Sequence, residues 1–229
     1  GGGDEWKRKI DAILNKLSRD NFNELADDML SVPMESLEML RETTTAIYDK
    51  ALAADGILCG VFADLCRELS MHSATWNFTQ VKSIDDPDTG VPKFFWAARV
   101  NPTEKDLIGP YASSEEARAK AKKETSFKRI LLNKCQEEFE KEDLYIRAEE
   151  EYKVLLRSAE YSSLGNDEKV RRKLQYNSKR KEIKKRMLGN VQFIGELFKQ
   201  GMLTERIMHE CILKMLGGRD GNGAAMRKP

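Results

Sequence analysis

Residues 57–69 read ILCGVFADLCREL, and apolar side chains recur in this stretch at steps of three and four residues. In a helix of 3.6 residues per turn, that spacing places them on one face. The positions are Ile57, Leu58, Val61, Phe62, Leu65, Cys66 and Leu69. The stretch therefore predicts an amphipathic helix that buries one face against a core.

The same spacing continues outward in both directions. It recurs over residues 6–17, 22–30 and 37–51, and again over 127–139, 144–156, 187–198 and 203–215. Most of the connections are short, so neighbouring helices should run antiparallel. Helix pairs of differing sequence, each hiding its apolar face only against its neighbours, are typical of an α-solenoid. We predict an all-α fold of about five stacked antiparallel helix pairs.

The helical spacing fails between His72 and Ala112. This segment holds four of the six prolines and two of the three tryptophans, which predicts a long aromatic- and proline-rich insertion after the second helix pair. Within it, KFFWAARV at residues 93–100 favours a short strand, because aromatic and branched side chains suit a pleated surface. Aromatic residues at this density favour packing on the helical body; an exposed recognition surface is the alternative.

Length and charge limit the class of protein. The 229 residues suit a single domain over 1–218, with a polar, glycine-rich tail at 219–229 that we expect to be disordered. The 39 Lys and Arg residues against 38 Asp and Glu leave a net charge of +1, so only a local cluster could indicate nucleic acid. No apolar run approaches the ~20 residues of a membrane-spanning helix. We expect a cytoplasmic protein without membrane association.

The sequence offers little for catalysis. An enzyme would need a nucleophile with its base, a cluster of metal ligands or a phosphate-binding glycine loop, and none of these motifs occurs. The four cysteines, at positions 59, 66, 135 and 211, lie among apolar residues without the spacing of a metal site, so we expect reduced core thiols. No catalytic residue, cofactor or metal site is predicted, and the protein is not expected to be an enzyme.

The strongest local charge lies between Lys169 and Arg186. Ten Lys and Arg residues fall in this run against one acid, Glu182. Such a run could attract RNA phosphates, or it could be a solvated helix face paired with the acidic stretch at 137–151. The candidate RNA-binding residues are Lys179, Arg180, Lys181, Lys184, Lys185 and Arg186.

Several strings carry a family resemblance. They are FKRILLNKCQEEFE at 127–140, LGNVQFIGELFK at 188–199, MLTE at 202–205, IMHEC at 207–211 and LNKL at 14–17. They resemble the middle domain of eukaryotic translation initiation factor 4 gamma. The resemblance covers residues ~6–71 and ~125–216, and it is specific because these are long matching strings rather than sparse motifs.

The resemblance implies a crescent of HEAT type that binds the DEAD-box RNA helicase factor 4A, raises its ATP turnover and touches RNA, with other initiation factors bound through a longer parent chain. The implied state is a monomer. By position, the helicase-binding residues would be Val32, Pro33, Met34, Asn190, Lys199, Gly201 and Met202. The alternative is an RNA-processing or mRNA-decay adaptor of the same solenoid family that binds another DEAD-box helicase.

The resemblance also bears on the segment from His72 to Ala112. The matched strings lie on either side of it in sequence. We therefore expect this segment to be ordered, to pack on the solenoid, and to be dispensable for helicase binding.

Overall fold

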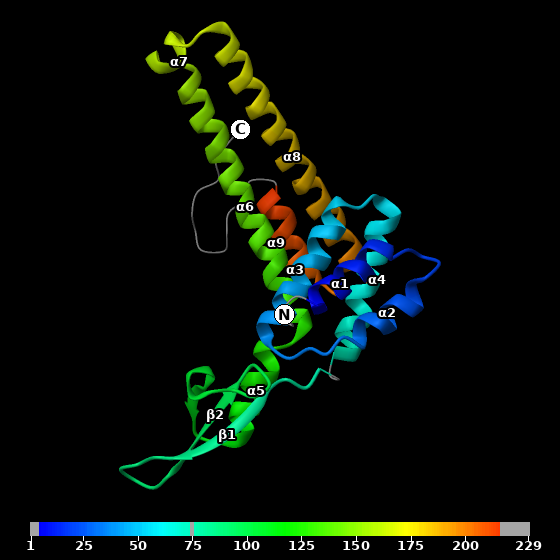
Figure 1. The fold of residues 1–229 in the computed structure, drawn as a ribbon, viewed down its shortest axis with the longest axis vertical. Coiled ribbons are helices and arrows are strands. Elements are labelled where there is room, and N and C mark those ends of the chain that lie inside the picture. Colours follow the sequence, from blue (N-terminus) through cyan, green and yellow to red (C-terminus); the bar gives the residue numbers. More distant parts are fainter. Residues whose placement is uncertain (1–4, 74–75, 216–229) are drawn as a thin grey trace.

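The computed structural model describes residues 5–73 and 76–215. A helical body occupies the middle of the molecule, a small sheet lies at one end, and two long helices project from the other as an arm (Figure 1). The helical solenoid that the residue spacing predicts is confirmed.

The N-terminal half of the body consists of two helical pairs. Helices α1 (Glu5–Lys16) and α2 (Phe22–Leu30) form the first, and α3 (Leu37–Ala53) and α4 (Gly56–His72) form the second. Two caps define where the later helices begin, because each satisfies a backbone amide of the first turn. The Ser36 hydroxyl accepts a hydrogen bond from the Met39 amide at 3.1 Å, and the Asp55 carboxylate accepts one from the Leu58 amide at 3.1 Å.

The C-terminal half contains two helices that are longer than the spacing predicts. Helix α6 (Phe127–Leu156) joins the two helices expected at 127–139 and 144–156, and α8 (Asn166–Lys199) continues from the basic run into the helix expected at 187–198. Neither 127–156 nor 166–188 contains glycine or proline, so nothing in the backbone chemistry ends a helix there. The short α7 (Ala159–Ser163) links them, and α9 (Glu205–Met215) follows.

The arm comprises residues 141–185, where α6 and α8 extend beyond the body (Figure 1). None of the arm side chains that the structure describes is buried. The rings of Tyr152 and Tyr176 stack with centroids 3.5 Å apart, and Arg180 Nε lies 2.9 Å from the Glu149 carboxylate. Among the side chains described, aromatic and ionic contacts join the two helices of the arm.

The core lies where α8 crosses α3 and α4. The largest fully buried side chains include Tyr48, Phe62, Phe127 and Phe193, and the rings of Tyr48 and Phe193 meet edge to face at 5.1 Å. At the crossing, a Cβ on Gly189 would lie 2.2 Å from the Leu52 carbonyl oxygen. Only glycine therefore permits α8 to approach the end of α3 this closely.

We predict that Gly189→Ala lowers the free energy of unfolding by about 1–3 kcal/mol, because the added methyl group meets backbone that cannot rotate away. The matched control is Gly195→Ala on the same helix, where a Cβ meets nothing within 4 Å. That variant should be stabilised by up to ~1 kcal/mol through helix propensity. Urea unfolding of both variants measures the difference; equal midpoints would contradict the close crossing.

The four cysteines are free and buried, as predicted. Burial raises the pKa of the Cys59 thiol to about 11 and that of Cys135 to about 12. Both thiols are therefore protonated at neutral pH, and they pack as small apolar groups.

The region from Gln80 to Glu124 forms a sheet unit, which adds strands to a fold that the spacing predicts as all helix. Strands β1 (Gln80–Asp85), β2 (Pro92–Ala97) and β3 (Ile108–Tyr111) make an antiparallel sheet in the order β1-β2-β3, followed by α5 (Ser114–Glu124). The strand predicted at 93–100 is confirmed as β2. Because Trp96, Ala97, Ala117 and Ala121 are all buried while α5 contacts the strands, the unit has a small core of its own.

Aromatic side chains anchor the sheet unit to the helical body. The Trp76 indole donates a hydrogen bond to the Leu30 carbonyl at 3.4 Å and meets the Phe127 ring edge to face at 6.4 Å. Phe78 is 2% exposed within the main core. Trp76 and Phe78 therefore pack on the helical body, as the aromatic content predicts, whereas Trp96 packs within the sheet unit.

Candidate interaction surfaces

The first predicted contact is the turn between α2 and α3. The side chains of Val32 and Met34 are buried at 1% and 6% exposure, whereas Pro33 between them is exposed. Val32 and Met34 therefore hold the turn against the core, and of the three predicted residues only Pro33 has an exposed side chain.

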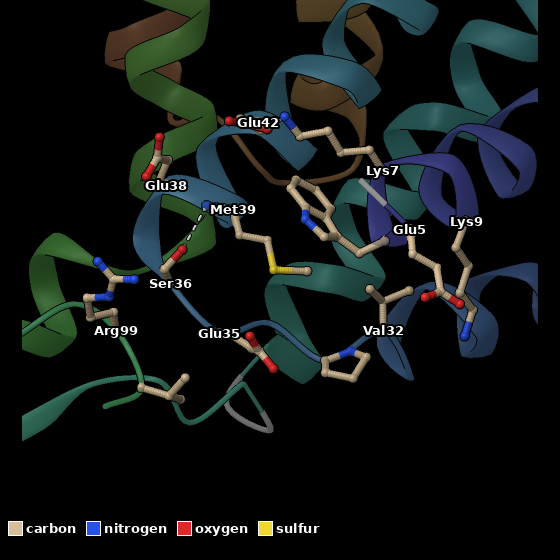
Figure 2. Close-up of a pocket in the computed structure, with 13 residues that line it drawn as sticks. Glu5, Lys7, Lys9, Val32, Glu35, Ser36, Glu38, Met39, Glu42 and Arg99 are labelled. Atoms are coloured by element: carbon tan, nitrogen blue, oxygen red, sulfur yellow. Dashed lines mark hydrogen bonds and ion pairs between the residues drawn. The ribbon is translucent and has the colours of Figure 1, made fainter. Parts of the chain in front are cut away.

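A groove of about 600 Å³ opens beside this turn (Figure 2). It lies between α1, the start of α3 and the segment that follows β2, with Met39 pointing into it. Four glutamates and three cations line it, and Lys7 forms an ion pair with Glu42 at 2.6 Å. Sequence reasoning missed this groove, because its walls come from three separate parts of the chain.

The second predicted contact lies at the C-terminal end of α8. Asn190 is 2% exposed and accepts a hydrogen bond from the Tyr48 hydroxyl, and Met202 is 4% exposed. Lys199 is exposed, with its ammonium group 2.8 Å from the Glu196 carboxylate, and Gly201 forms an exposed turn with φ of +69°. Lys199 and Gly201 are therefore accessible, whereas Asn190 and Met202 belong to the core.

Three apolar side chains on α8 are exposed although the spacing predicts them in the core stripe. Leu188 is 62% exposed, Val191 38% and Phe198 40%. The sequence already indicates this exposure, because apolar residues between 187 and 198 occur at more positions than one helix face can hold. The surplus residues form an exposed apolar stripe beside Lys199.

The buried bond between Tyr48 and Asn190 predicts a measurable stability effect. Asn190→Ala should lower the free energy of unfolding by about 1–3 kcal/mol, because it leaves the Tyr48 hydroxyl buried without that acceptor. Adding Tyr48→Phe removes the hydroxyl as well. The double variant should therefore lose less than the sum of the two single losses, and simple additivity in denaturant unfolding would contradict the pairing.

The basic run separates into paired and exposed cations. At the root of the arm, the Arg186 guanidinium donates hydrogen bonds to Glu138 at 2.7 Å from both Nε and Nη2, and to Asp49 at 2.7 Å. Arg180 pairs with Glu149. Four lysines of the run are exposed and form no ion pair with any residue that the structure describes. They are Lys179, Lys181, Lys184 and Lys185.

Three of these lysines, Lys181, Lys184 and Lys185, lie together around a hollow of about 360 Å³ at the base of the arm. The C-terminal end of α3, at Leu52, Ala53 and Ala54, forms the other side. Of the six residues predicted to bind RNA, the structure therefore gathers three at one site and ties Arg186 into the fold.

The Glu138 carboxylate decides the electrostatics of the arm root. Its side chain is 3% exposed. Burial by itself raises the pKa of a carboxyl group, but hydrogen bonds from Arg186 and then Lys141 outweigh it and hold the pKa of Glu138 below its ordinary value. Glu138 is therefore an ionised, buried group whose charge depends on its cationic partners.

Among the residues of 5–73 and 76–215 whose side chains the structure describes, no group of three or more His, Cys, Asp and Glu could hold a metal ion. Over the same part of the chain, no helix has the length and apolar character that crossing a bilayer requires.

Comparisons with known proteins show the family to which the chain belongs. The model of the MIF4G domain matches residues 7–220. The chain is 34% identical over 211 residues to eukaryotic translation initiation factor 4G of Arabidopsis thaliana, covering 92% of this chain and 9% of that protein. It is 28% identical over 213 residues to factor 4 gamma 1 of Mus musculus, covering 93% and 10%. The chain thus spans about a tenth of the length of these relatives, and it belongs to the MIF4G domain family.

Proposed function

We propose that this chain is a scaffold domain of translation initiation that binds the DEAD-box RNA helicase factor 4A and raises its ATPase rate in the cytoplasm. The observation that carries the proposal is the family match over residues 7–220, shared with relatives that are named as initiation factors. The domain performs no chemistry of its own. Its effect is exerted on the partner.

Two exposed surfaces suit the two lobes of a helicase. One is the groove beside Pro33, and the other is the end of α8, where Phe198, Lys199 and Gly201 are accessible. A scaffold that contacts both lobes favours one arrangement of them. It shifts the population of that arrangement only by its difference in affinity for the two states.

RNA contact is the second part of the proposal. Lys181, Lys184 and Lys185 concentrate positive charge around one hollow. Attraction of this kind reads phosphates rather than bases, so it should be weakly selective for sequence and strongly dependent on salt.

The test is the ATPase rate of purified factor 4A, measured with and without this chain at saturating RNA. Stimulation together with a complex in calorimetry supports the proposal. The absence of both overturns it. Recovery of a different DEAD-box helicase from cell extract, in place of factor 4A, would favour the alternative of an RNA-processing or mRNA-decay adaptor.

A further inference from the structure

The sheet unit joins the helical body at the turn that the family resemblance assigns to helicase binding. The Leu37 amide donates a hydrogen bond to the Ala98 carbonyl at 2.8 Å, and the Val100 amide donates to the Glu35 carbonyl at 2.8 Å. Between them, Ser36 and Arg99 pair as an antiparallel β-bridge. These bonds hold the segment that follows β2 against residues 35–37, directly after Met34.

This junction builds one wall of the groove. Arg99 and Val100 line it together with Trp6 and Lys9 of α1 and with the turn at Pro33. Figure 2 shows Arg99 and Glu5 on opposite sides of the groove. Without the sheet unit, the space beside Pro33 would be open on that side. The expectation that residues 72–112 are dispensable for helicase binding depended on their distance in sequence from the matched strings. In the fold, Arg99 and Val100 of this segment lie beside the turn at Pro33, so that reason no longer holds.

The charges around the groove favour a cationic partner. Of the three cations, Lys7 pairs with Glu42, Arg99 pairs with Asp106 at 3.5 Å, and Lys9 is exposed and forms no ion pair with the described residues. The remaining glutamates, at positions 5, 35 and 38, are exposed and form no ion pair within the described part of the chain. Three unpaired glutamates against the one unpaired lysine leave an excess of negative charge at the groove. Such an excess attracts a basic segment and speeds its association.

We propose that the groove walled by α1, the turn at 32–36 and the sheet-unit residues Arg99 and Val100 docks a basic segment of the helicase that carries an apolar anchoring side chain. Trp6, Pro33 and Val100 supply the accessible apolar surface, and Glu5, Glu35 and Glu38 receive the positive charges. The sheet unit thereby contributes directly to partner binding. This inference rests on the proposed function, and it adds to it a recognition site and the chemistry of the segment that occupies it.

Charge reversal tests the electrostatic part. Glu35→Lys with Glu38→Lys should weaken the complex with factor 4A by about ten-fold at low salt, and the loss should shrink as salt is raised. The matched control is Glu24→Lys with Glu150→Lys, which changes the net charge equally at two exposed positions outside the groove. Calorimetry of the full chain should find the control within two-fold of the unsubstituted chain.

A photo-reactive amino acid tests the contact with the sheet unit. Placed at position 99, it should form a crosslink to the helicase. Placed at Arg118, an exposed position on α5 that does not line the groove, it should form none. Circular dichroism establishes that each variant is folded before it is compared.

The outcomes separate the two proposals. The inference is overturned if factor 4A binds the charge-reversed variant with an affinity within two-fold of that for the unsubstituted chain. It is also overturned if the helicase crosslinks at position 118 and not at position 99. Either result leaves the proposed function standing. Failure of the unsubstituted chain to bind factor 4A overturns the proposed function and the inference with it.

Discussion

Arg186→Met should lower the free energy of unfolding by about 3–5 kcal/mol, the cost typical of removing one member of a buried ion pair. The guanidinium is the group that joins α8 to Glu138 of α6 and to Asp49 of α3. Methionine preserves much of the side-chain volume and removes the charge. The loss would therefore report the Glu138 carboxylate left at 3% exposure without its main partner.

The neighbouring residue provides the control for this prediction. Lys185→Met removes a cation from an exposed side chain that forms no ion pair with the described residues, so its effect on unfolding should stay within about 0.5 kcal/mol. Replacing Glu138 and Arg186 together should recover most of the loss, because no buried charge remains. Equal losses for Arg186→Met and Lys185→Met in denaturant unfolding would contradict the ion-pair network.

The loss caused by Arg186→Met should also depend on pH. The folded pKa of Glu138 lies below its unfolded value, so its ionisation stabilises the fold above the unfolded pKa of about 4.3, and this contribution fades as pH falls through the folded pKa. In Arg186→Met the carboxyl group loses its main hydrogen-bond donor, and its folded pKa should rise. The difference between the unsubstituted chain and the variant should therefore be largest near neutral pH and shrink below pH ~4.

The positions of the helices could be predicted because apolar spacing is a local property. Residues at steps of three and four in 57–69 need only the geometry of the helix to share a face, and α4 forms there. The ends of α6 and α8 were harder to place. A charged stretch without glycine or proline is compatible both with a loop and with a helix that continues into solvent, and here it continues.

The roles of individual site residues could not be predicted from spacing, because they depend on distant parts of the chain. Lys185 and Arg186 are neighbours with the same charge, yet only Arg186 faces Glu138 and Asp49. Asn190 is buried because Tyr48, 142 positions earlier, supplies its hydrogen-bond donor. A string of matching residues identifies a surface of the family, but it does not distinguish residues that contact a partner from residues that hold the surface in place.

The sheet unit shows the same limit at a larger scale. Its central strand could be predicted from aromatic and branched residues, and the burial of Phe78 agrees with the preference for packed aromatic side chains. The bridge between Ser36 and Arg99 cannot be recognised from either local sequence, because backbone amides and carbonyls form it. Its consequence is the groove, which no single stretch of the sequence encodes.

Replacing Lys181, Lys184 and Lys185 with glutamate should flatten the salt dependence of RNA binding. Each phosphate contact to a single strand contributes a slope of about −0.7 in a plot of log affinity against log salt, so loss of three contacts should reduce the slope by about 2. These side chains are exposed and gather around one hollow, so the fold should survive the change. Fluorescence anisotropy of a labelled single-stranded RNA over a range of salt concentrations measures the slope.

A second triple variant separates a phosphate site from a general effect of charge. Lys122→Glu, Lys123→Glu and Lys128→Glu alter the net charge equally, at exposed positions of α5 and the start of α6. If the arm lysines bind phosphate, this control should retain most of the slope, because the effect of distant charges is screened over about 10 Å at 0.1 M salt. If both variants reduce the slope equally, RNA responds to total charge, and the three arm lysines are only a solvated helix face.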